Sequence, residues 1–299
     1  MFTVVPHYKI NKEKWDACLM SSTVIRIYGR YDFLNCLCKN WSAIIYNDYE
    51  AIMPLTGRKK FLINYLYQPF FCASLGVFGN NISADLLNKF LCKIPEKYKY
   101  WDIYLNSGNL FSLSQFDFQI RVNYYLNLKN SYSKLFDSFS INHKRNIKID
   151  HVFVIKKNIP VNEVIKLAHK QSKKFSPIKL KDFKSFEQLY SFWFQHDKGV
   201  TYGVYDNDEL LASAAFLYDN SRAYYLLVGN SEAGRKKSAS HILINKFIYD
   251  HAGSDIILDF AGSNIKSIAR FYQGFGAVEE KYPALKKNNI SPLLRIIGK

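Results

Sequence analysis

Long apolar runs are missing from this 299-residue chain, although 48% of its residues are hydrophobic. No run approaches the ~20 residues that a membrane-spanning helix needs. The first residues, Met1 to Lys14, also lack the apolar stretch of a secretory signal,. We therefore expect a cytoplasmic protein without a membrane span. The apolar content is enough for one large domain or two ordinary ones.

Cysteine is scarce, and its spacing does not suit a metal site. The chain has five cysteines, all in its first third, and none forms a C-x-x-C pair. Cys36-x-Cys38 has no histidine at ligand spacing, so we expect reduced thiols and no metal,. The H-E-x-x-H, Walker and Ser-His-Asp patterns are missing as well, which argues against common hydrolase and NTPase classes.

Acidic residues are few compared with basic ones. The 25 Asp and Glu residues oppose 41 Lys and Arg residues, which leaves a formal charge of +16. Such a charge suits an anionic partner such as RNA, a coenzyme or a nucleotide-sugar. The alternative is that lysines spread over the whole chain reflect only the base composition of the genome.

The chain contains two successive α/β patterns. In the first, a helix, a hairpin and the basic turn Leu55-Thr-Gly-Arg-Lys-Lys60 precede a helix capped by Ser83 and a strand at 101–105,. The second has a strand at 122–128, a helix from Ser131 into the basic run 143–148, and a three-stranded meander over 200–229. A helix over 238–251 follows. This order predicts an α/β fold.

The stretch 254–277 predicts a buried strand, a turn and a short helix. Ile256 to Phe260 form the apolar run, and Ser263 or Asn264 can cap the helix,. Gly276 can end it, because glycine tolerates the left-handed conformation that follows many helices.

Several motifs of the sequence are similar to those of one enzyme family. Phe271, Tyr272 and Gly276 match a Phe-Tyr-x-x-x-Gly pattern found near the end of GNAT acyltransferase domains. Arg235-x-x-Ser238-x-Ser240 matches the coenzyme loop Arg/Gln-x-x-Gly-x-Gly/Ala, with serine at both glycine positions. The segments 123–135, 140–148, 259–263 and 270–276 resemble the Fem-type group, which builds peptidoglycan bridges.

The resemblance implies an α/β (mixed α+β) fold with two tandem GNAT-like domains. Each is expected to be a mixed, mostly antiparallel sheet flanked by helices. The first covers residues 1–120, and segment 288–299 can complete it with a strand at 293–297. The second covers residues 121–287.

The implied reaction is transfer of an acyl group from acyl-CoA, such as acetyl-CoA, to the amine of a small molecule or peptide. Two alternatives stay open. One is a Fem-like aminoacyltransferase that uses aminoacyl-tRNA and a cell-wall precursor, so tRNA is a candidate partner. The other is a non-catalytic binding protein that kept the fold, which serines 238 and 240 would suit.

The resemblance also implies roles for particular residues. Tyr272 is expected to protonate the leaving thiolate, unless it is only a core aromatic. Asp259 is a general-base candidate or a turn cap. A backbone amide at Leu227, Val228 or Gly229 would polarise the acyl carbonyl. The coenzyme phosphates would meet the helix N-terminus and its loop: Gly234, Arg235, Lys236, Lys237, Ser238, Ala239 and Ser240. Lys144 and Arg145 could bind a nucleotide or tRNA, or simply complement a helix dipole.

Overall fold

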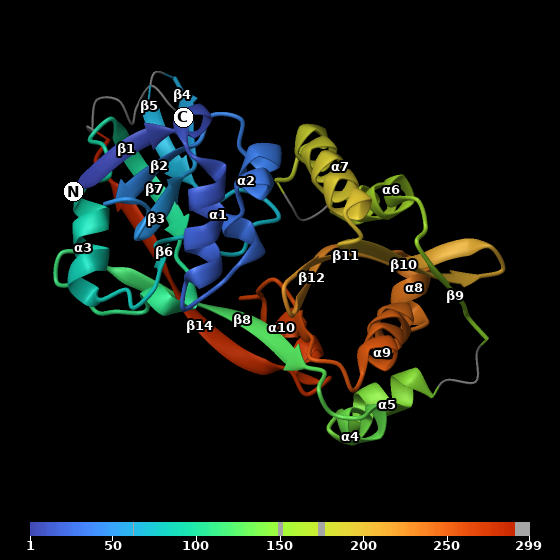
Figure 1. The fold of residues 1–299 in the computed structure, drawn as a ribbon. Helices are drawn as coiled ribbons and strands as arrows, with labels where there is room; N and C mark the ends of the chain where they lie inside the picture. The colour runs from blue at the N-terminus through green and yellow to red at the C-terminus, as the bar shows by residue number, and fades with distance from the viewer. Residues whose placement is uncertain (62, 149–151, 173–176, 291–299) are drawn as a thin grey trace. The chain divides into compact units, whose positions relative to one another are not determined.

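The chain folds into two compact units. The computed structural model describes residues 1–61, 63–148, 152–172 and 177–290 (Figure 1). One unit is Met1–Arg121 together with the segment that begins at Lys281, and the other is Val122–Glu280. The strand expected at 293–297 lies outside the described residues. Both units combine β-strands with flanking helices, as the sequence predicts.

The first unit contains two groups of strands. One is antiparallel with the order β1-β2-β3-β6, comprising β1 (Phe2–Pro6), β2 (Ser42–Tyr46), β3 (Ala51–Leu55) and β6 (Phe78–Gly79). The other has the order β4-β5-β7-β14, comprising β4 (Gly57–Lys60), β5 (Ile63–Tyr67), β7 (Tyr98–Tyr104) and β14 (Val278–Asn288). The expected basic turn is wrong in part, because Gly57–Lys60 pairs with β5 as a strand.

The helices of the first unit are α1 (Lys12–Ser21), α2 (Tyr31–Leu37) and α3 (Ala84–Cys92). Ser83 caps α3 as predicted, because its Oγ accepts the amide hydrogen of Leu86 at 3.1 Å. Phe90 of α3 belongs to a core cluster with Trp101 and Ile103 of β7. Burying such rings and branched chains supplies ~1.5–3 kcal/mol per side chain.

The second unit is built on strands in the order β8-β13-β12-β11-β10-β9. They are β8 (Phe118–Asn127), β13 (Ile257–Asp259), β12 (Arg222–Asn230), β11 (Glu209–Asp219), β10 (Gly199–Asp206) and β9 (Val154–Lys157). The expected meander is β10, β11 and β12, and only the pair β12/β13 is parallel. β14 crosses the boundary between the units in sequence, because Val278 to Glu280 belong to the second unit and the residues from Lys281 belong to the first.

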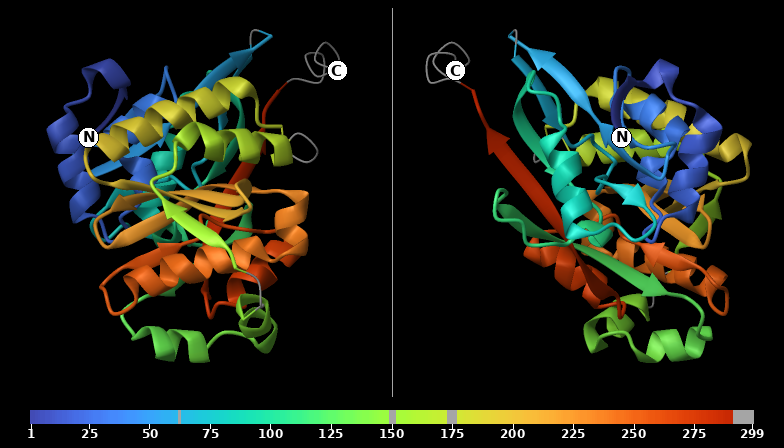
Figure 2. Two further views of the ribbon diagram at one scale, coloured as in Figure 1. Left: turned by 90° about the vertical axis from the view of Figure 1, so that its right-hand side faces the viewer. Right: turned by 60° about the vertical axis from the view of Figure 1, so that its left-hand side comes forward.

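Helices cover both faces of the β10–β12 meander (Figures 1 and 2). α6 (Val161–Ser172) and α7 (Leu180–Gln195) lie on one face, and α9 (Ala239–His251) lies on the other. Phe216 of β11 stacks on Phe247 of α9, with ring centroids 4.0 Å apart. The remaining helices are α4 (Tyr132–Asp137), α5 (Ile141–Ile147), α8 (Glu232–Lys236) and α10 (Lys266–Gln273).

Two local expectations are corrected by the structure. The single helix expected from Ser131 is broken into α4 and α5, because Ser140 starts a new helix by accepting the amide hydrogen of His143 at 3.2 Å. The cap of α10 is Ile265, not Ser263 or Asn264. The Ser263 hydroxyl instead accepts the amide hydrogen of Ile265 at 3.2 Å, which forms a local turn before the helix,.

Candidate functional site

The parallel strands β12 and β13 part from each other in the middle of the second unit. Their pairing covers only three positions, from Arg222 beside Ile257 to Tyr224 beside Asp259. β12 then continues to Asn230, whereas the chain after β13 turns away through Ala261 and Gly262, both with positive φ. Among the described residues, one side of β12 therefore has no neighbouring strand beyond Tyr224.

A β-bulge in β12 directs one amide toward the open side. Leu226 has no partner, since Tyr225 faces Phe216 and Leu227 faces Ala215. Ser231 donates its amide hydrogen to the carbonyl of Leu211 on β11 at 2.8 Å. Because amide directions alternate along a strand, the Leu227 and Gly229 amides also point to β11. Of the three residues predicted here, Val228 is the one whose amide points into the opening.

A pocket of about 300 Å³ lies at this opening. Its walls come from β12, the α8–α9 segment, α10 and α6. Tyr225 and Val228 contribute from β12, and Ile268, Phe271 and Tyr272 from α10. The other lining residues are Gln171, Asn230, Arg235, Ser238, Ser240 and His241. The site therefore unites a free strand amide, a phenol and the start of a helix.

Tyr272 has a ring fixed by other aromatics and a place on the pocket wall. Its ring stacks on Phe260, with centroids 4.2 Å apart, and meets Tyr225 edge-on at 6.5 Å. The side chain is 8% exposed, and burial raises its pKa above the usual value for a tyrosine. The phenol is thus protonated at neutral pH and able to donate a proton.

The loop before α9 has the backbone path that the glycine pattern would need. Ser238 adopts the left-handed conformation, with φ 55° and ψ 28°, at a position where the family pattern has glycine. α9 starts at the next residue, so its first amide hydrogens are not used inside the helix,. Ser238, Ala239 and Ser240 accordingly form a helix N-terminus at the pocket, which favours negative charge.

The three cations of this loop have different surroundings. Arg235 lines the pocket, and its Nη1 donates to the carbonyl oxygen of Asn230 at 2.9 Å. Lys236 lies 3.4 Å from Glu232 one turn earlier on α8. Lys237 pairs with Asp206 of β10. The structure therefore brings Arg235 to the pocket and gives Lys236 and Lys237 carboxylate partners.

Two histidines beneath the pocket were not among the predicted site residues. The rings of His143 and His241 lie 4.6 Å apart, and His241 lines the pocket. Burial lowers the pKa of His241 to about 4, with a further contribution from His143, whose own pKa is also lowered by burial. Both rings are therefore neutral at pH 7. The sequence shows only that His143 follows Ser140 by three residues and that His241 lies on a predicted helix. No pattern in the sequence predicts that the two rings are close together.

Gln171 is a second pocket residue that the sequence did not reveal. Its Oε1 accepts the amide hydrogen of Asn230 at 2.7 Å. Asn230 and Val228 point their amides to the same side of β12, so Gln171 closes one end of this side. Gly229 lies against α6, because an added Cβ would come within 2.7 Å of the Ala168 nitrogen. That close approach brings Gln171 to the strand end.

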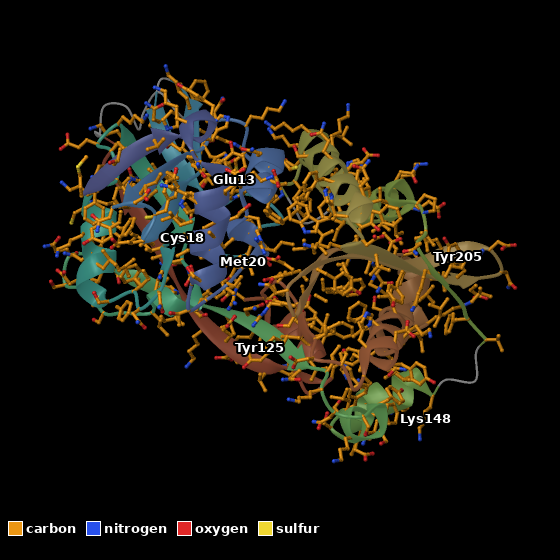
Figure 3. The ribbon with its side chains drawn as sticks, in the orientation of Figure 1. Glu13, Cys18, Met20, Tyr125, Lys148 and Tyr205 are labelled. Atoms are coloured by element: carbon orange, nitrogen blue, oxygen red, sulfur yellow. The ribbon has the colours of Figure 1, made fainter. Side chains whose placement is uncertain are left out.

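Asp259 is held in a buried network. It is 1% exposed, and its Oδ2 lies 2.6 Å from the guanidinium of Arg222. This guanidinium also lies 5.5 Å from the ring centre of Tyr125. Tyr125 is a residue of β8 (Figure 3). The Oδ1 of Asp259 accepts hydrogens from Asn123 Nδ2 at 3.1 Å and from the Ala261 amide at 2.8 Å. These contacts correspond to the turn-capping alternative, and Asp259 does not line the pocket.

Lys144 and Arg145 lie on α5, which also carries no pocket residue (Figure 1). Lys144 Nζ donates to the carbonyl of Asp137 at 2.8 Å, and Arg145 donates to Asn142 at 2.8 Å. Within the described ranges there is no group of three or more His, Cys, Asp or Glu residues able to hold a metal ion. No helix among the described residues has the length and apolarity required to cross a membrane.

Comparison with known proteins gives one domain match and a fold. Residues 163–264 match the family model of the acetyltransferase (GNAT) domain. A crystal structure of FemX is 13% identical, with a TM-score of 0.64 over 100% of both chains. A tandem GNAT protein from the clavulanic acid biosynthesis pathway is 10% identical, with a TM-score of 0.58 over 97% of this chain and 99% of that one.

A third similar structure is L-PGS from Bacillus licheniformis, at 12% identity and a TM-score of 0.53, covering 96% of this chain and 95% of the other. At identities this low, the TM-scores demonstrate a common fold and nothing more. No curated protein matches the sequence. The fold is therefore that of tandem GNAT-like domains, as the motifs predict.

Proposed function

We propose that this chain transfers an acyl group from acyl-CoA, such as acetyl-CoA, to an amine. The match of residues 163–264 to the acetyltransferase (GNAT) domain and the fold shared with FemX support this proposal. The acceptor would be a small molecule or a peptide. One observation carries the proposal. The free amide of Val228 and the hydroxyl-bearing ring of Tyr272 line the same pocket, where β12 and β13 part.

The chemistry needs two groups at the acyl carbonyl. When the amine attacks, a C–N bond forms and negative charge develops on the carbonyl oxygen. A preorganised amide such as that of Val228 stabilises this charge, typically by several kcal/mol. When the C–S bond then breaks, the leaving thiolate takes a proton. Tyr272 can supply it, and the proton released by the amine restores the phenol through solvent.

The phosphates of the donor suit the start of α9. Unused amide hydrogens of a helix N-terminus, together with the guanidinium of Arg235, are complementary to a pyrophosphate. Ser238 has already adopted the left-handed backbone. Serine thus occupies a conformation that glycine would favour, and it adds hydroxyl groups,.

Aminoacyl-tRNA is the second candidate donor. Its ester carbonyl would undergo the same attack, and the +16 charge of the chain favours a polyanionic donor,. In that case a ribose hydroxyl leaves in place of a thiol. A cell-wall precursor amine would then be the acceptor, as in the Fem-type resemblance.

Binding of coenzyme A tests the site directly. We expect Arg235→Ala to weaken binding by ~1.5–3 kcal/mol in titration calorimetry, the cost of losing a charged hydrogen bond. Lys236→Ala is the matched control, because this neighbouring lysine pairs with Glu232 and does not line the pocket. Equal losses for both variants would show that general charge, not the pocket, holds the coenzyme.

Turnover tests the role of Tyr272. Tyr272→Phe keeps the stacked ring and removes only the hydroxyl, so it should lower the rate of thiol release from acetyl-CoA by ~10²–10⁴-fold at unchanged melting temperature. Unchanged turnover would exclude this residue as the acid. If wild-type protein binds coenzyme A but transfers no acyl group from it, the same amine acceptors are assayed with aminoacyl-tRNA. Failure with both donors would support the non-catalytic alternative.

A further inference from the structure

The first unit has a sheet face lined with tyrosines. In the register of β4, β5 and β7, Tyr65 lies between Arg58 and Tyr100, and Tyr67 lies opposite Asp102. Residues that face each other across a sheet point to the same side, and so do residues two apart. Tyr65, Tyr67, Tyr100 and Tyr104 are therefore on one side, which we call the tyrosine face. None of the four is buried.

Cations sit against these rings. The guanidinium of Arg58 lies 3.9 Å from the ring centre of Tyr67, and that of Arg121 lies 4.2 Å from that of Tyr104. On β14, Lys286 faces Asp102 in the register, and its ammonium group lies 5.9 Å from the ring centre of Tyr100. The face thus combines aromatic rings with three cations and the carboxylate of Asp102, so its net charge is positive.

The tyrosines do not belong to the core of the unit. The opposite side of the same strands supplies that core, where Leu66, Trp101 and Ile103 cluster with residues of α3. On the tyrosine face, the hydroxyl of Tyr67 has a contact of 3.5 Å with Cys38 Sγ, at the end of α2. Packing in the α3 core therefore does not account for four rings and their cations on this face.

The face continues into a basic hairpin. β4 is the edge strand, and the hairpin that it forms with β5 projects from the sheet (Figure 2). Lys60 and Phe61 are exposed near its tip, Phe61 by 65%, and the ammonium of Lys60 lies 5.1 Å from this ring. Lys and Arg outnumber Asp and Glu about two to one in this unit,.

We propose that the tyrosine face binds single-stranded nucleic acid, with bases stacked on Tyr65 and Tyr100, since guanidinium groups already lie over Tyr67 and Tyr104. The phosphates would lie on Arg58, Arg121 and Lys286. Every base offers a π-face to an aromatic side chain, whereas bases inside a duplex are already stacked on each other. Flanking cations neutralise the backbone that connects the stacked bases. The site lies in the first unit. The proposal is therefore independent of which acyl donor the pocket of the second unit binds.

The test measures the affinity of a fluorescein-labelled 12-nucleotide single-stranded RNA by fluorescence anisotropy between 50 and 200 mM salt. Tyr100→Ala should weaken binding about tenfold, the usual loss for one stacked base, while Tyr100→Phe retains the ring and the affinity. Arg58→Ala should lower the slope of log affinity against log salt by about 0.7, the value for one phosphate contact of a single strand.

Two matched controls decide whether the face itself is responsible. Lys59→Ala removes the charge next to Arg58 from the other side of β4, and Tyr8→Ala removes a tyrosine that is 72% exposed elsewhere in the unit. Both should bind the RNA like wild type. Losses in these controls equal to those of Arg58→Ala and Tyr100→Ala would overturn the proposal in favour of diffuse charge.

Other ligands complete the test. The duplex form of the same RNA should bind at least about tenfold more weakly, because its bases cannot stack on the tyrosines. Equal affinity for the duplex, or binding to phosphatidylglycerol vesicles that Tyr100→Ala abolishes in place of RNA binding, would contradict a single-strand site. Coenzyme A affinity of Tyr100→Ala should match wild type, so this proposal and the proposed function fail separately.

Discussion

Gly274→Ala is a sharp test of the packing beneath the pocket. Gly274 ends α10 with ordinary helical angles, φ −62° and ψ −19°, so alanine is allowed by the backbone. The surrounding side chains, however, leave no space for an added Cβ atom. A Cβ at this position would lie 2.0 Å from Cε1 of His143 and 2.4 Å from both ring nitrogens. The imidazole must therefore move.

The cost of moving this ring can be estimated from its contacts. His143 makes two hydrogen bonds of 2.9 Å, to the Ser140 hydroxyl and to the carbonyl of Phe271. Each is worth ~0.5–1.5 kcal/mol net. Overpacking against Phe275, whose ring centre is 4.5 Å away, adds ~1–3 kcal/mol,. Alanine gains ~0.5–1 kcal/mol over glycine in a helical backbone, so we expect a net loss of about 1–5.5 kcal/mol.

Urea unfolding of the full chain measures this loss. Gly253→Ala is the control, because its backbone is unfavourable for alanine but its surroundings are open. Its φ is +81°, and nothing lies within 4 Å of the added Cβ. It should cost only about 1 kcal/mol, from backbone strain. In a His143→Ala background, Gly274→Ala should cost almost nothing, because the ring is gone. Wild-type stability of Gly274→Ala, or the same cost in both backgrounds, would refute the reasoning.

Three further results follow from the second unit. His241 titrates at a pKa of about 4 in the fold, below the 6.5 of a free histidine, and the pKa of His143 is also lowered. The unfolded chain therefore takes up protons first as pH falls, so the melting temperature should drop between pH 6.5 and about 4, and less in His241→Asn. Ser238→Gly removes a left-handed serine and should raise stability by about 1 kcal/mol in urea unfolding,. Asp259→Asn removes the buried carboxylate that pairs with the partly exposed Arg222 and should cost about 2–4 kcal/mol in the same assay,.

The sequence predicted the fold where local patterns were strong. The strands of the meander were predicted from their alternating apolar residues, and α9 was predicted from its apolar stripe. Both predictions are confirmed, because these patterns depend only on residues close together in the sequence,. The break between α4 and α5 was missed, since a serine inside a basic amphipathic run reads as helix until its hydroxyl caps a new one. Likewise, residues 57–60 were predicted to be a turn, because a glycine followed by three cations does not show the apolar alternation of a strand.

The site was predictable only in part. Short motifs bring Tyr272, Arg235 and Ser238 to attention, and all three line the pocket. The choice of Val228 among three neighbours depends on a bulge, and that is fixed by pairing with β11. Gln171 and His143 come from segments far away in the sequence. Their placement follows from tertiary packing, which no local pattern encodes.

The pairing of β14 with β7 determines which unit is completely synthesised first. Residues 284–288 complete the sheet of the first unit by pairing with β7 at residues 100–104, across the whole of the second unit in sequence. A ribosome therefore releases every residue of Val122–Glu280 before it releases the residues of β14 that pair with β7,. During synthesis the second unit can fold first, while the edge of β7 stays open to mispairing. A chain stopped after Glu280 would keep every residue that lines the pocket and lose the residues of β14 that pair with β7.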